Sequence, residues 1–506
     1  MNLKRKPLIT NIIWNFTSFF ANLLVSFFLA RFILGQIGSV KYGIWVLVGS
    51  FLSYAGLMDL GISTAIVQRI AGSVAKGNRE EIQDIITTAT SLFSLIGLLV
   101  FLVCFLFSAI DASLFNIPLE LGENFSFLLI ILGGGVGFSF LGRVHLGILR
   151  ALERFDIVNI IILIQICFQV LFIVLFLKHS ILVLGIIYAS LNIAVNLSYM
   201  IAAKMLLPDY RFASVNFNRS TIQSLGVYGF FAFLIMLADR FRFYTDSFVI
   251  GHFLGAGAIT TFYFGNRLVE YSRNVIAPMA SPFLSLFSRY ERTFNQKDSQ
   301  EAFFRLSRIT ALLSFLVCGF LIGAGYPFLT LWIGERIDSV RSSYIVLLIL
   351  SVPSTIDVAQ IVSVNLLYGI NRHKYLSYLT MSEGLVNLIL SILFVRFFGI
   401  YGVALGTALP MLVTKGFYQP MYVCAQVGIR PLHYFKKCLL MPLIFGAFVL
   451  GLQLSLFQVF QNIRWLHVLA VSVLSAVCVC PFIYFLFFSK EEKDWIGLSY
   501  RNWSRR

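Results

Sequence analysis

The chain has 506 residues, of which 58% are hydrophobic and 12% are charged, and its 39 Lys and Arg against 23 Asp and Glu give a net charge of +16. A soluble protein carries roughly 25% charged residues and needs a polar surface, so this composition excludes a soluble globular domain. Apolar runs of about 20 residues, which cross a bilayer as helices, are therefore the unit to look for.

Fourteen apolar segments of helical length follow one another along the chain. The first follows a basic start, "MNLKRKP", and is longer than the roughly 7–15 apolar residues of a signal peptide, so we interpret it as an uncleaved span. Short alternating strands are absent from the sequence, and only helices and closed barrels satisfy their backbone in hydrocarbon. The predicted fold class is therefore all-α, a polytopic integral membrane protein with about 14 transmembrane helices. The segments are 9–34, 43–66, 84–109, 124–149, 157–177, 181–206, 222–250, 256–287, 304–330, 342–368, 375–397, 400–425, 438–459 and 465–488.

The basic residues test the number and direction of these spans. With the N-terminus inside, 27 of the 39 basic residues fall in inner segments, seven at outer ends and five within spans. Cytoplasmic loops carry an excess of Lys and Arg, and one missed span would reverse every later loop. We therefore predict that both termini are cytoplasmic. Topology and anionic inner-leaflet lipid explain the positive charge without a nucleic-acid partner.

Cofactor chemistry has no motif in this sequence. None of the seven cysteines has metal-ligand spacing, and the six histidines are scattered along the chain. The phosphate-binding loop G-x-x-x-x-G-K-[ST] is also absent. We therefore expect no metal, no cofactor, no ATP site on this chain, and no enzymatic activity.

The second half of the sequence repeats features of the first at a constant spacing. Gly35 corresponds to Gly255 and Arg69 to Arg289, and the two pairs are separated by the same length of chain. Because six spans is an even number, both copies enter the membrane from the same side, which predicts two pseudo-symmetric six-helix lobes. Transporters with parallel repeats place the substrate path between the two halves. The predicted parts are an N-lobe at 1–212, a C-lobe at 213–428, and two extra helices with a basic cytoplasmic tail at 429–506.

Four stretches resemble a known family. They are "LGQIGSVKYG", "MDLGISTAIVQRIA", "TDSFVIGHFLGAGAITTFYFGNRL" and "MASPFLSLFSRY". They are similar to the polysaccharide transporter family, with its Wzx-type O-antigen flippases, of the MATE-like multidrug/oligosaccharidyl-lipid/polysaccharide exporter superfamily. The resemblance covers about 1–425 and implies two six-helix lobes in a V shape. It further implies a flippase that moves an undecaprenyl-pyrophosphate-linked oligosaccharide from the inner to the outer leaflet of the bacterial inner (plasma) membrane.

Charged side chains within the spans need an explanation, because each costs about 2.5–3.5 kcal/mol at the centre of a bilayer. They must pair with one another or face water. Helical spacing predicts structural ion pairs among Asp239, Arg242 and Asp246, and allows a further pair between Glu270 and Arg273.

The basic residues suggest a binding site for phosphate. Arg240 points away from its charged neighbours, and Lys415 has no acid within four residues. Guanidinium groups match phosphate oxygens and tolerate a partly dry cavity. Arg31 lies near the outer end of a span, where it could instead reach the interface. The predicted substrate-binding residues of a central cavity are Arg240, Arg267, Arg273, Lys415 and Arg31.

The acids within spans are candidates for coupling transport to H+ or Na+, since intramembrane carboxylates mark ion relays. These candidates are Asp59, Glu270, Asp357 and Glu383. The alternative is that they are hydrogen-bonded acids between helices. Without an ATP motif, uphill transport would need an ion gradient or removal of the product by a polysaccharide polymerase. The expected partners are thus the lipid-linked oligosaccharide, membrane lipids and such a polymerase.

Three other functions stay open at this stage. A cation-coupled multidrug antiporter of the same superfamily typically has an acid in its first span, and 9–34 has none. A lipid II flippase handles the same lipid carrier and is distinguished by being essential. A membrane scaffold without transport activity would have no reason to keep so many costly intramembrane charges.

Overall fold

The computed structural model describes residues 8–207, 236–237, 239–242, 244–292, 296–337, 339–370, 372–460 and 462–487. Within these ranges the chain is helical and contains no strand. It divides into two compact units, which we call unit 1 (Met1–Thr260 with Arg336–Asp338) and unit 2 (Thr261–Glu335 with Ser339–Arg506). The predicted lobe boundary at 212/213 lies outside the described residues.

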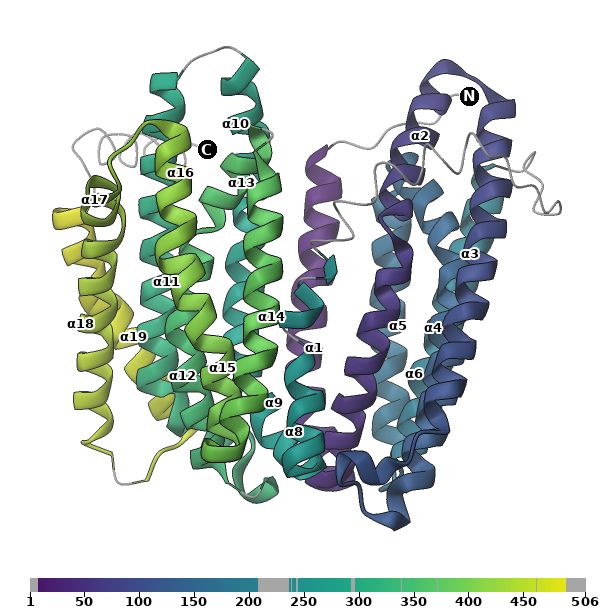
Figure 1. Ribbon diagram of the computed structural model, residues 1–506, viewed down its shortest axis with the longest axis horizontal. Coiled ribbons are helices and arrows are strands. Elements are labelled where there is room, and N and C mark those ends of the chain that lie inside the picture. The colour runs from purple at the N-terminus through teal and green to yellow at the C-terminus, as the bar shows by residue number, and fades with distance from the viewer. Residues whose placement is uncertain are drawn as a thin grey trace. The chain divides into compact units, whose positions relative to one another are not determined.

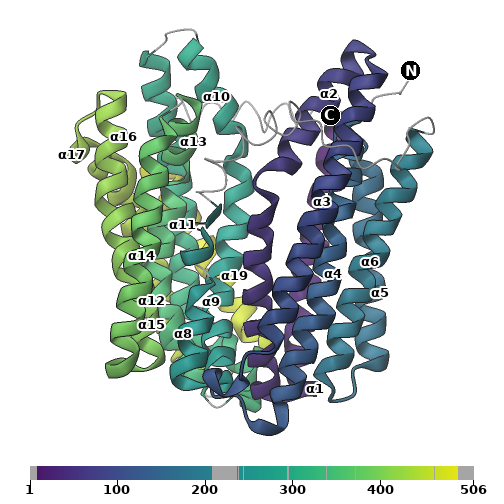
Figure 2. The ribbon, with the colours of Figure 1, turned by 45° about the vertical axis from the view of Figure 1, so that its right-hand side comes forward.

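Unit 1 is a helical bundle in which α4 packs against α3 and α6 (Figures 1 and 2). Its short 3-10 helices η1 (Gly56–Asp59) and η2 (Ala112–Phe115) interrupt or connect the longer elements. The long helices are α1 (Leu8–Ala55), α2 (Ile62–Lys76), α3 (Arg79–Ser108), α4 (Leu119–Ala151), α5 (Phe155–Phe176), α6 (Ile181–Leu206) and α8 (Thr245–Leu254).

The first two predicted spans, 9–34 and 43–66, do not form two separate helices. Helix α1 contains both the first span and part of the second, and it turns at Gly38, whose φ of 81° suits glycine. The second span is then broken inside its predicted range by η1 and by two left-handed residues, Leu60 and Gly61. Helix α2 continues to Lys76, well past the predicted end at 66.

Helices α3 and α4 touch through glycines, as small residues allow in membranes. A Cβ built on Gly97 would lie 2.3 Å from the backbone oxygen of Gly137, which lies in the "LGGGVG" stretch. The two backbones therefore approach too closely for any side chain at this point.

Gly97→Ala is expected to destabilise unit 1 by about 1–3 kcal/mol, because the helices must move apart to admit a methyl group. The thermal unfolding midpoint of the purified protein measures this. Gly72→Ala is the matched control, since Gly72 lies in α2 with no heavy atom within 4 Å of its Cβ position. Equal midpoints for the two variants would contradict the close packing.

Unit 2 is a second helical bundle, in which α11 packs against α12 and α18, and α14 packs against α15. Its α-helices are α9 (Ala256–Ile276, which begins in unit 1), α10 (Ser281–Arg292), α11 (Gln296–Trp332), α12 (Val340–Ala359), α13 (Ile361–Gly369), α14 (His373–Phe398), α15 (Ile400–Val413), α16 (Gln419–Val427), α17 (Pro431–Tyr434), α18 (Met441–Phe457) and α19 (Trp465–Phe482). Short 3-10 and π-helices lie between or after them, at η3 (Ala277–Ala280), η4 (Gly334–Arg336), η5 (Thr414–Tyr418), η6 (Phe435–Leu440) and η7 (Ile483–Phe487).

Helices in the second half of the chain begin at nearly the same distance from their counterparts in the first half as the spacing of the sequence repeat. Helices α4 and α12 begin at Leu119 and Val340, and this spacing is close to the one that separates Gly35 from Gly255. The starts of α6 and α15 repeat it, and so do the 3-10 breaks η1 and η3. The turn at Gly255, with φ/ψ of 87°/173°, matches the turn at Gly38, with 81°/170°, so the backbone makes Gly38 the counterpart of Gly255 and corrects the predicted match with Gly35. The local backbone therefore repeats along the chain.

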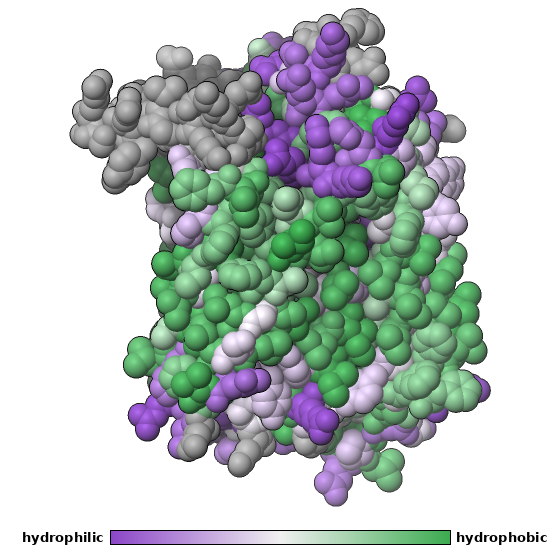
Figure 3. Space-filling view, turned by 90° about the vertical axis from the view of Figure 1, so that its left-hand side faces the viewer, coloured by the Kyte–Doolittle hydropathy of each residue, from purple (hydrophilic) through white to green (hydrophobic). Residues whose placement is uncertain are grey.

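The surface is that of a membrane protein. On the face shown in Figure 3, hydrophobic side chains form a belt between two more polar ends. Helices α18 and α19 expose large apolar side chains, among them Leu443, Leu469 and Val473. Eleven helical stretches of the described ranges are long and apolar enough to cross a membrane, and one of them, Ile13–Asp59, contains the turn at Gly38. The chain is therefore a multi-pass, all-helical membrane protein, and the count of 14 spans stays a prediction.

Candidate functional site

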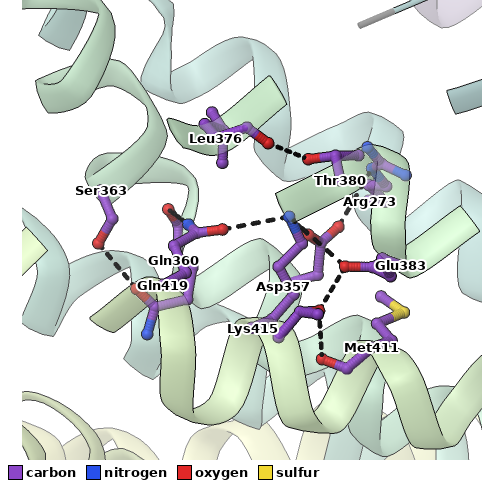
Figure 4. Close-up of polar contacts among 11 residues, drawn as sticks. Arg273, Asp357, Gln360, Ser363, Leu376, Thr380, Glu383, Met411, Lys415 and Gln419 are labelled. Atoms are coloured by element: carbon purple, nitrogen blue, oxygen red, sulfur yellow. Dashed lines mark hydrogen bonds and ion pairs between the residues drawn. The ribbon is translucent and has the colours of Figure 1, made fainter. Parts of the chain in front are cut away.

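Four charged side chains meet inside unit 2, and we call them the lysine cluster: Arg273, Asp357, Glu383 and Lys415 (Figure 4). The Nζ atom of Lys415 lies 3.9 Å from Oδ1 of Asp357 and 3.9 Å from Oε2 of Glu383. The Nε atom of Arg273 lies 3.8 Å from Oδ2 of Asp357. Only 4% of the Lys415 side chain is exposed. The cluster thus balances two positive charges against two negative ones.

Irregular backbone positions these residues. Asp357 lies in the last turn of α12, just before the helix is interrupted at Gln360. Lys415 lies in the π-helix η5, a wide turn of a kind often found at functional sites. Pro420 follows this turn. Because proline lacks an N–H and its ring clashes with the carbonyl one turn earlier, it explains the widening.

Neutral polar groups extend the lysine cluster. Lys415 donates a hydrogen bond of 3.1 Å to Oε1 of Gln419, whose amide donates to the backbone oxygen of Gln360 at 3.3 Å. The hydroxyl of Thr414 donates to Glu383. These groups are buried and come from Gln360 at the break between α12 and α13, from α14 and from the η5–α16 segment. Hydrogen bonding offsets the cost of burying them.

This geometry corrects two expectations drawn from helical spacing. Lys415 is a buried, paired cation rather than a free one, because its partners lie on other helices, α12 and α14. Arg273 pairs with Asp357, and Glu270 pairs with Arg267 instead. A contact of Lys415 or Arg273 with substrate, and ion coupling at Asp357 or Glu383, stay predictions.

Arg267 lies in an aromatic setting on α9. Its guanidinium group is 4.8 Å from the ring centre of Tyr271 and 5.6 Å from that of Tyr263. Its Nη1 atom donates to Oε2 of Glu270 at 2.8 Å, and 26% of its side chain is exposed. Cation–π contacts hold the guanidinium in place while leaving part of it accessible.

Asp59 of unit 1 has partners that its neighbouring sequence does not reveal. It accepts hydrogen bonds from the hydroxyl and the backbone N–H of Ser63, at 2.7 and 3.2 Å. Its Oδ2 atom lies 3.6 Å from Nη1 of Arg143, whose guanidinium stacks on Phe140 at 4.1 Å. The geometry therefore agrees with the alternative of a hydrogen-bonded acid between helices.

Asp59→Asn is expected to lower the unfolding midpoint slightly, by the equivalent of about 1 kcal/mol, because both side chains of the ion pair keep some solvent contact. Transport should persist, since an amide oxygen can still accept from Ser63. The double variant Asp59→Asn/Arg143→Leu should recover the midpoint. Lost transport at an unchanged midpoint would instead make Asp59 a coupling residue.

Arg240 is held by aromatic and backbone contacts. Its guanidinium lies 4.8 Å from the ring centre of Tyr244, and its backbone oxygen accepts a hydrogen bond of 3.2 Å from the hydroxyl of Tyr54. Its Nε atom is buried without a hydrogen-bond partner, and no ion pair joins Arg240 to another described residue. Arg240 therefore has no acidic partner in the described part of the chain, and its place inside the membrane stays a prediction.

The other predicted charges of unit 1 vary in burial. Arg242 and Asp246 are buried, and Asp239 is half-buried. Their mutual ion pairs stay a prediction. Arg31 is half-buried in α1, before the turn at Gly38, and has no ion pair among the described residues.

The model of one protein family, described as polysaccharide biosynthesis protein, matches residues 28–342, more than half of the chain. The chain belongs to this family of polysaccharide transporters. Two relatives are similar to it over most of their length. The uncharacterised membrane protein EpsK of Bacillus subtilis (strain 168) is 22% identical over 96% of this chain and 97% of its own. A Shigella flexneri protein assigned as an O-antigen transporter is 22% identical over 82% of this chain and 97% of its own.

Solved structures share the fold of this polysaccharide transporter. The lipid II flippase MurJ in an inward closed conformation gives a TM-score of 0.72 at 16% identity, covering 94% of this chain and 99% of its own. An inward-facing MATE family multidrug transporter gives a TM-score of 0.68 at 16% identity, covering 79% of this chain and 94% of its own. These likenesses confirm the MATE-like fold class, and with the family match they confirm the resemblance found in the sequence.

Several residues of the two charged sites are not apparent from the sequence. Arg143 lies near the inner end of the predicted span 124–149 and is counted there with the inner basic residues, so it is not among the candidate intramembrane charges. Gln360 and Gln419 carry no charge, so a search for intramembrane charges passes over them. The available signal is that glutamines lie inside apolar spans, where polar groups are costly.

Proposed function

We propose that this polysaccharide transporter is a flippase. It moves undecaprenyl-pyrophosphate-linked O-antigen, or another surface-polysaccharide unit, from the inner to the outer leaflet of the bacterial inner membrane by alternating access. Both termini lie in the cytoplasm, as the distribution of basic residues indicates. The relative assigned as an O-antigen transporter and the fold shared with a lipid II flippase support this function.

The proposal rests on the pairing and the exposure of three arginines that the sequence predicts to lie in membrane spans. Arg240 has no acidic partner in the described chain, and the side chains of Arg267 and Arg273 are 26% and 33% exposed. Accessible guanidinium groups in a membrane span suit an anionic cargo, because they can form paired hydrogen bonds with phosphate oxygens. We assign substrate binding to these three residues, and to Arg31 in a secondary role.

The energy source in this proposal is an ion gradient or removal of product by a polymerase, and no cofactor takes part. The lysine cluster favours H+ over Na+ as a coupling ion. The ammonium group of Lys415 lies between Asp357 and Glu383, where a Na+ ion would need to bind. A proton, in contrast, needs only one carboxylate oxygen.

A deletion strain tests the function. We expect it to lose surface polysaccharide and to accumulate lipid-linked repeat units on the cytoplasmic leaflet, and the wild-type gene should reverse both effects. Intact surface polysaccharide with increased drug susceptibility would instead indicate the multidrug antiporter. Lethality with accumulated lipid II would indicate the lipid II flippase.

A further inference from the structure

An apolar, partly open cavity lies in unit 1, lined by residues of α1, η1, α3, α4 and the segment that contains α8. Its volume is about 390 Å³, within the roughly 300–1,000 Å³ of sites that bind small molecules. Phe51, Val103, Leu129 and Phe248 are among its lining residues. We infer that this cavity binds the part of a polyprenyl chain that adjoins its phosphate, with Arg240 holding that phosphate. This inference rests on the proposed function and assigns the lipid end of its substrate.

The lining offers almost nothing to a polar ligand. Its two hydroxyl groups belong to Tyr54 and Thr245, and their oxygens are 2.8 Å apart, bonded to each other. The Tyr54 hydroxyl also contacts the backbone oxygen of Arg240 at 3.2 Å. With these groups engaged, the other side chains of the lining present carbon, the Cys104 thiol and the Met58 thioether, and so suit a hydrocarbon chain.

Arg240 lies at the edge of this cavity. The next residue, Phe241, lines it, and so does Ala55. A Cβ on Gly56, the neighbour of Ala55, would be 3.8 Å from Nη2 of Arg240. The guanidinium, stacked on Tyr244, thus stands beside an apolar chamber with its Nε unbonded. A cation next to a hydrocarbon site complements a lipid phosphate and repels a cationic drug.

Aromatic rings shape the chamber for an unsaturated, branched chain. The ring of Phe51 meets that of Phe248 edge to face at 4.5 Å and that of Phe107 at 5.4 Å. Rings packed against one another form fixed walls and present both faces and edges to a neighbouring π-system. Each isoprene unit has a double bond and a methyl branch, whereas a saturated acyl chain has neither. The polyprenyl chain is therefore the occupant we assign.

Photolabelling of the purified full-length protein in lipid nanodiscs tests this assignment. Three probes carry a diazirine in the hydrocarbon chain: a polyprenyl phosphate, the matching polyprenyl alcohol, and phosphatidylglycerol. Peptides containing 51–58, 99–107 and 241–248 should be labelled by polyprenyl phosphate at least about tenfold more than by phosphatidylglycerol, a difference of about 1.4 kcal/mol in binding. Arg240→Ala should reduce labelling by polyprenyl phosphate and leave that by the alcohol unchanged.

Two variants that fill the cavity complete the test. Leu99→Trp and Val103→Trp place a large ring into the chamber, and each should reduce polyprenyl phosphate labelling by about tenfold. The Leu99 side chain is about half exposed, so the Leu99→Trp protein is expected to fold even if the Val103→Trp protein does not. Leu175→Trp is the control, because Leu175 is an exposed residue of α5 outside the lining.

Equal labelling by phosphatidylglycerol, or labelling that both cavity variants leave unchanged, would overturn the inference. Measuring surface polysaccharide in cells that carry the same variants distinguishes a failure of this inference from a failure of the proposed function. Full export by a cavity variant that is no longer labelled would reject the inference alone. Normal polysaccharide in the deletion strain, with labelling as predicted, would reject the proposed function and leave a polyprenyl phosphate site.

Discussion

Replacing Lys415 with methionine is expected to destabilise unit 2 by about 3–5 kcal/mol, the cost of leaving a buried charge without its partner. The ammonium group is the shared partner of Asp357 and Glu383, and its side chain is only 4% exposed. Its removal leaves one excess negative charge in the cluster. Because the position of Lys415 is buried, water does not take the place of the ammonium group. The thermal unfolding midpoint and the amount of folded protein in the membrane should both fall sharply.

A charge-compensated variant gives the control for this prediction. Lys415→Met/Glu383→Gln removes one positive and one negative charge, and it leaves the pair formed by Arg273 and Asp357. Its midpoint should return most of the way to that of the wild type, because buried ion pairs can be replaced by neutral groups at little cost. A stable Lys415→Met protein, or a double variant no better than the single one, would contradict the paired cluster.

Arg267→Ala and Arg240→Ala are each expected to abolish surface polysaccharide while the protein stays folded. Loss of a hydrogen-bonded charge pair with a phosphate costs about 2–5 kcal/mol, equivalent to at least roughly 30-fold weaker binding. Neither side chain forms a buried ion pair: Arg240 has no acidic partner in the described chain, and Arg267 is partly exposed beside Glu270. Surface polysaccharide and membrane protein levels are measured together.

Arg150→Ala is the matched control, because Arg150 is an exposed arginine near the end of α4. It removes the same charge from the same chain without touching the proposed site, and its export should equal that of the wild type. Full export by Arg240→Ala and Arg267→Ala would remove both residues from the substrate site. Loss of the protein itself would show that their role is in folding.

Helix positions can be predicted well because hydrocarbon selects for uninterrupted apolar length. The segment predicted at 181–206 is α6, Ile181–Leu206. The second span shows the limit of this reasoning. Its break at η1 and Gly61 depends on local left-handed conformations, and hydropathy does not respond to them. Helix α2 also extends beyond the apolar stretch, because helical hydrogen bonding continues where the side chains become polar.

Helical spacing narrows the partners of a charged residue but does not decide between them. Glu270 has an arginine one turn away on either side, and it pairs with Arg267, whose Nη1 atom lies 2.8 Å from Oε2 of Glu270, and not with Arg273 as predicted. Lys415 and Asp357 are distant in the sequence and lie on different helices, so their contact depends on tertiary packing, which helical periodicity does not contain. The same is true of Asp59 and Arg143. The absence of a nearby acid in the sequence therefore does not show that a cation is free.

Translocation by purified protein tests the central claim most directly. The protein is reconstituted into vesicles with an undecaprenyl-pyrophosphate-linked saccharide, and the saccharide that reaches the opposite leaflet is measured by its accessibility to an added lectin. We predict translocation by the wild type without ATP, and none above protein-free vesicles for Arg240→Ala and Arg267→Ala. A wild-type protein that does not move this lipid, or variants that move it at the wild-type rate, would contradict the account.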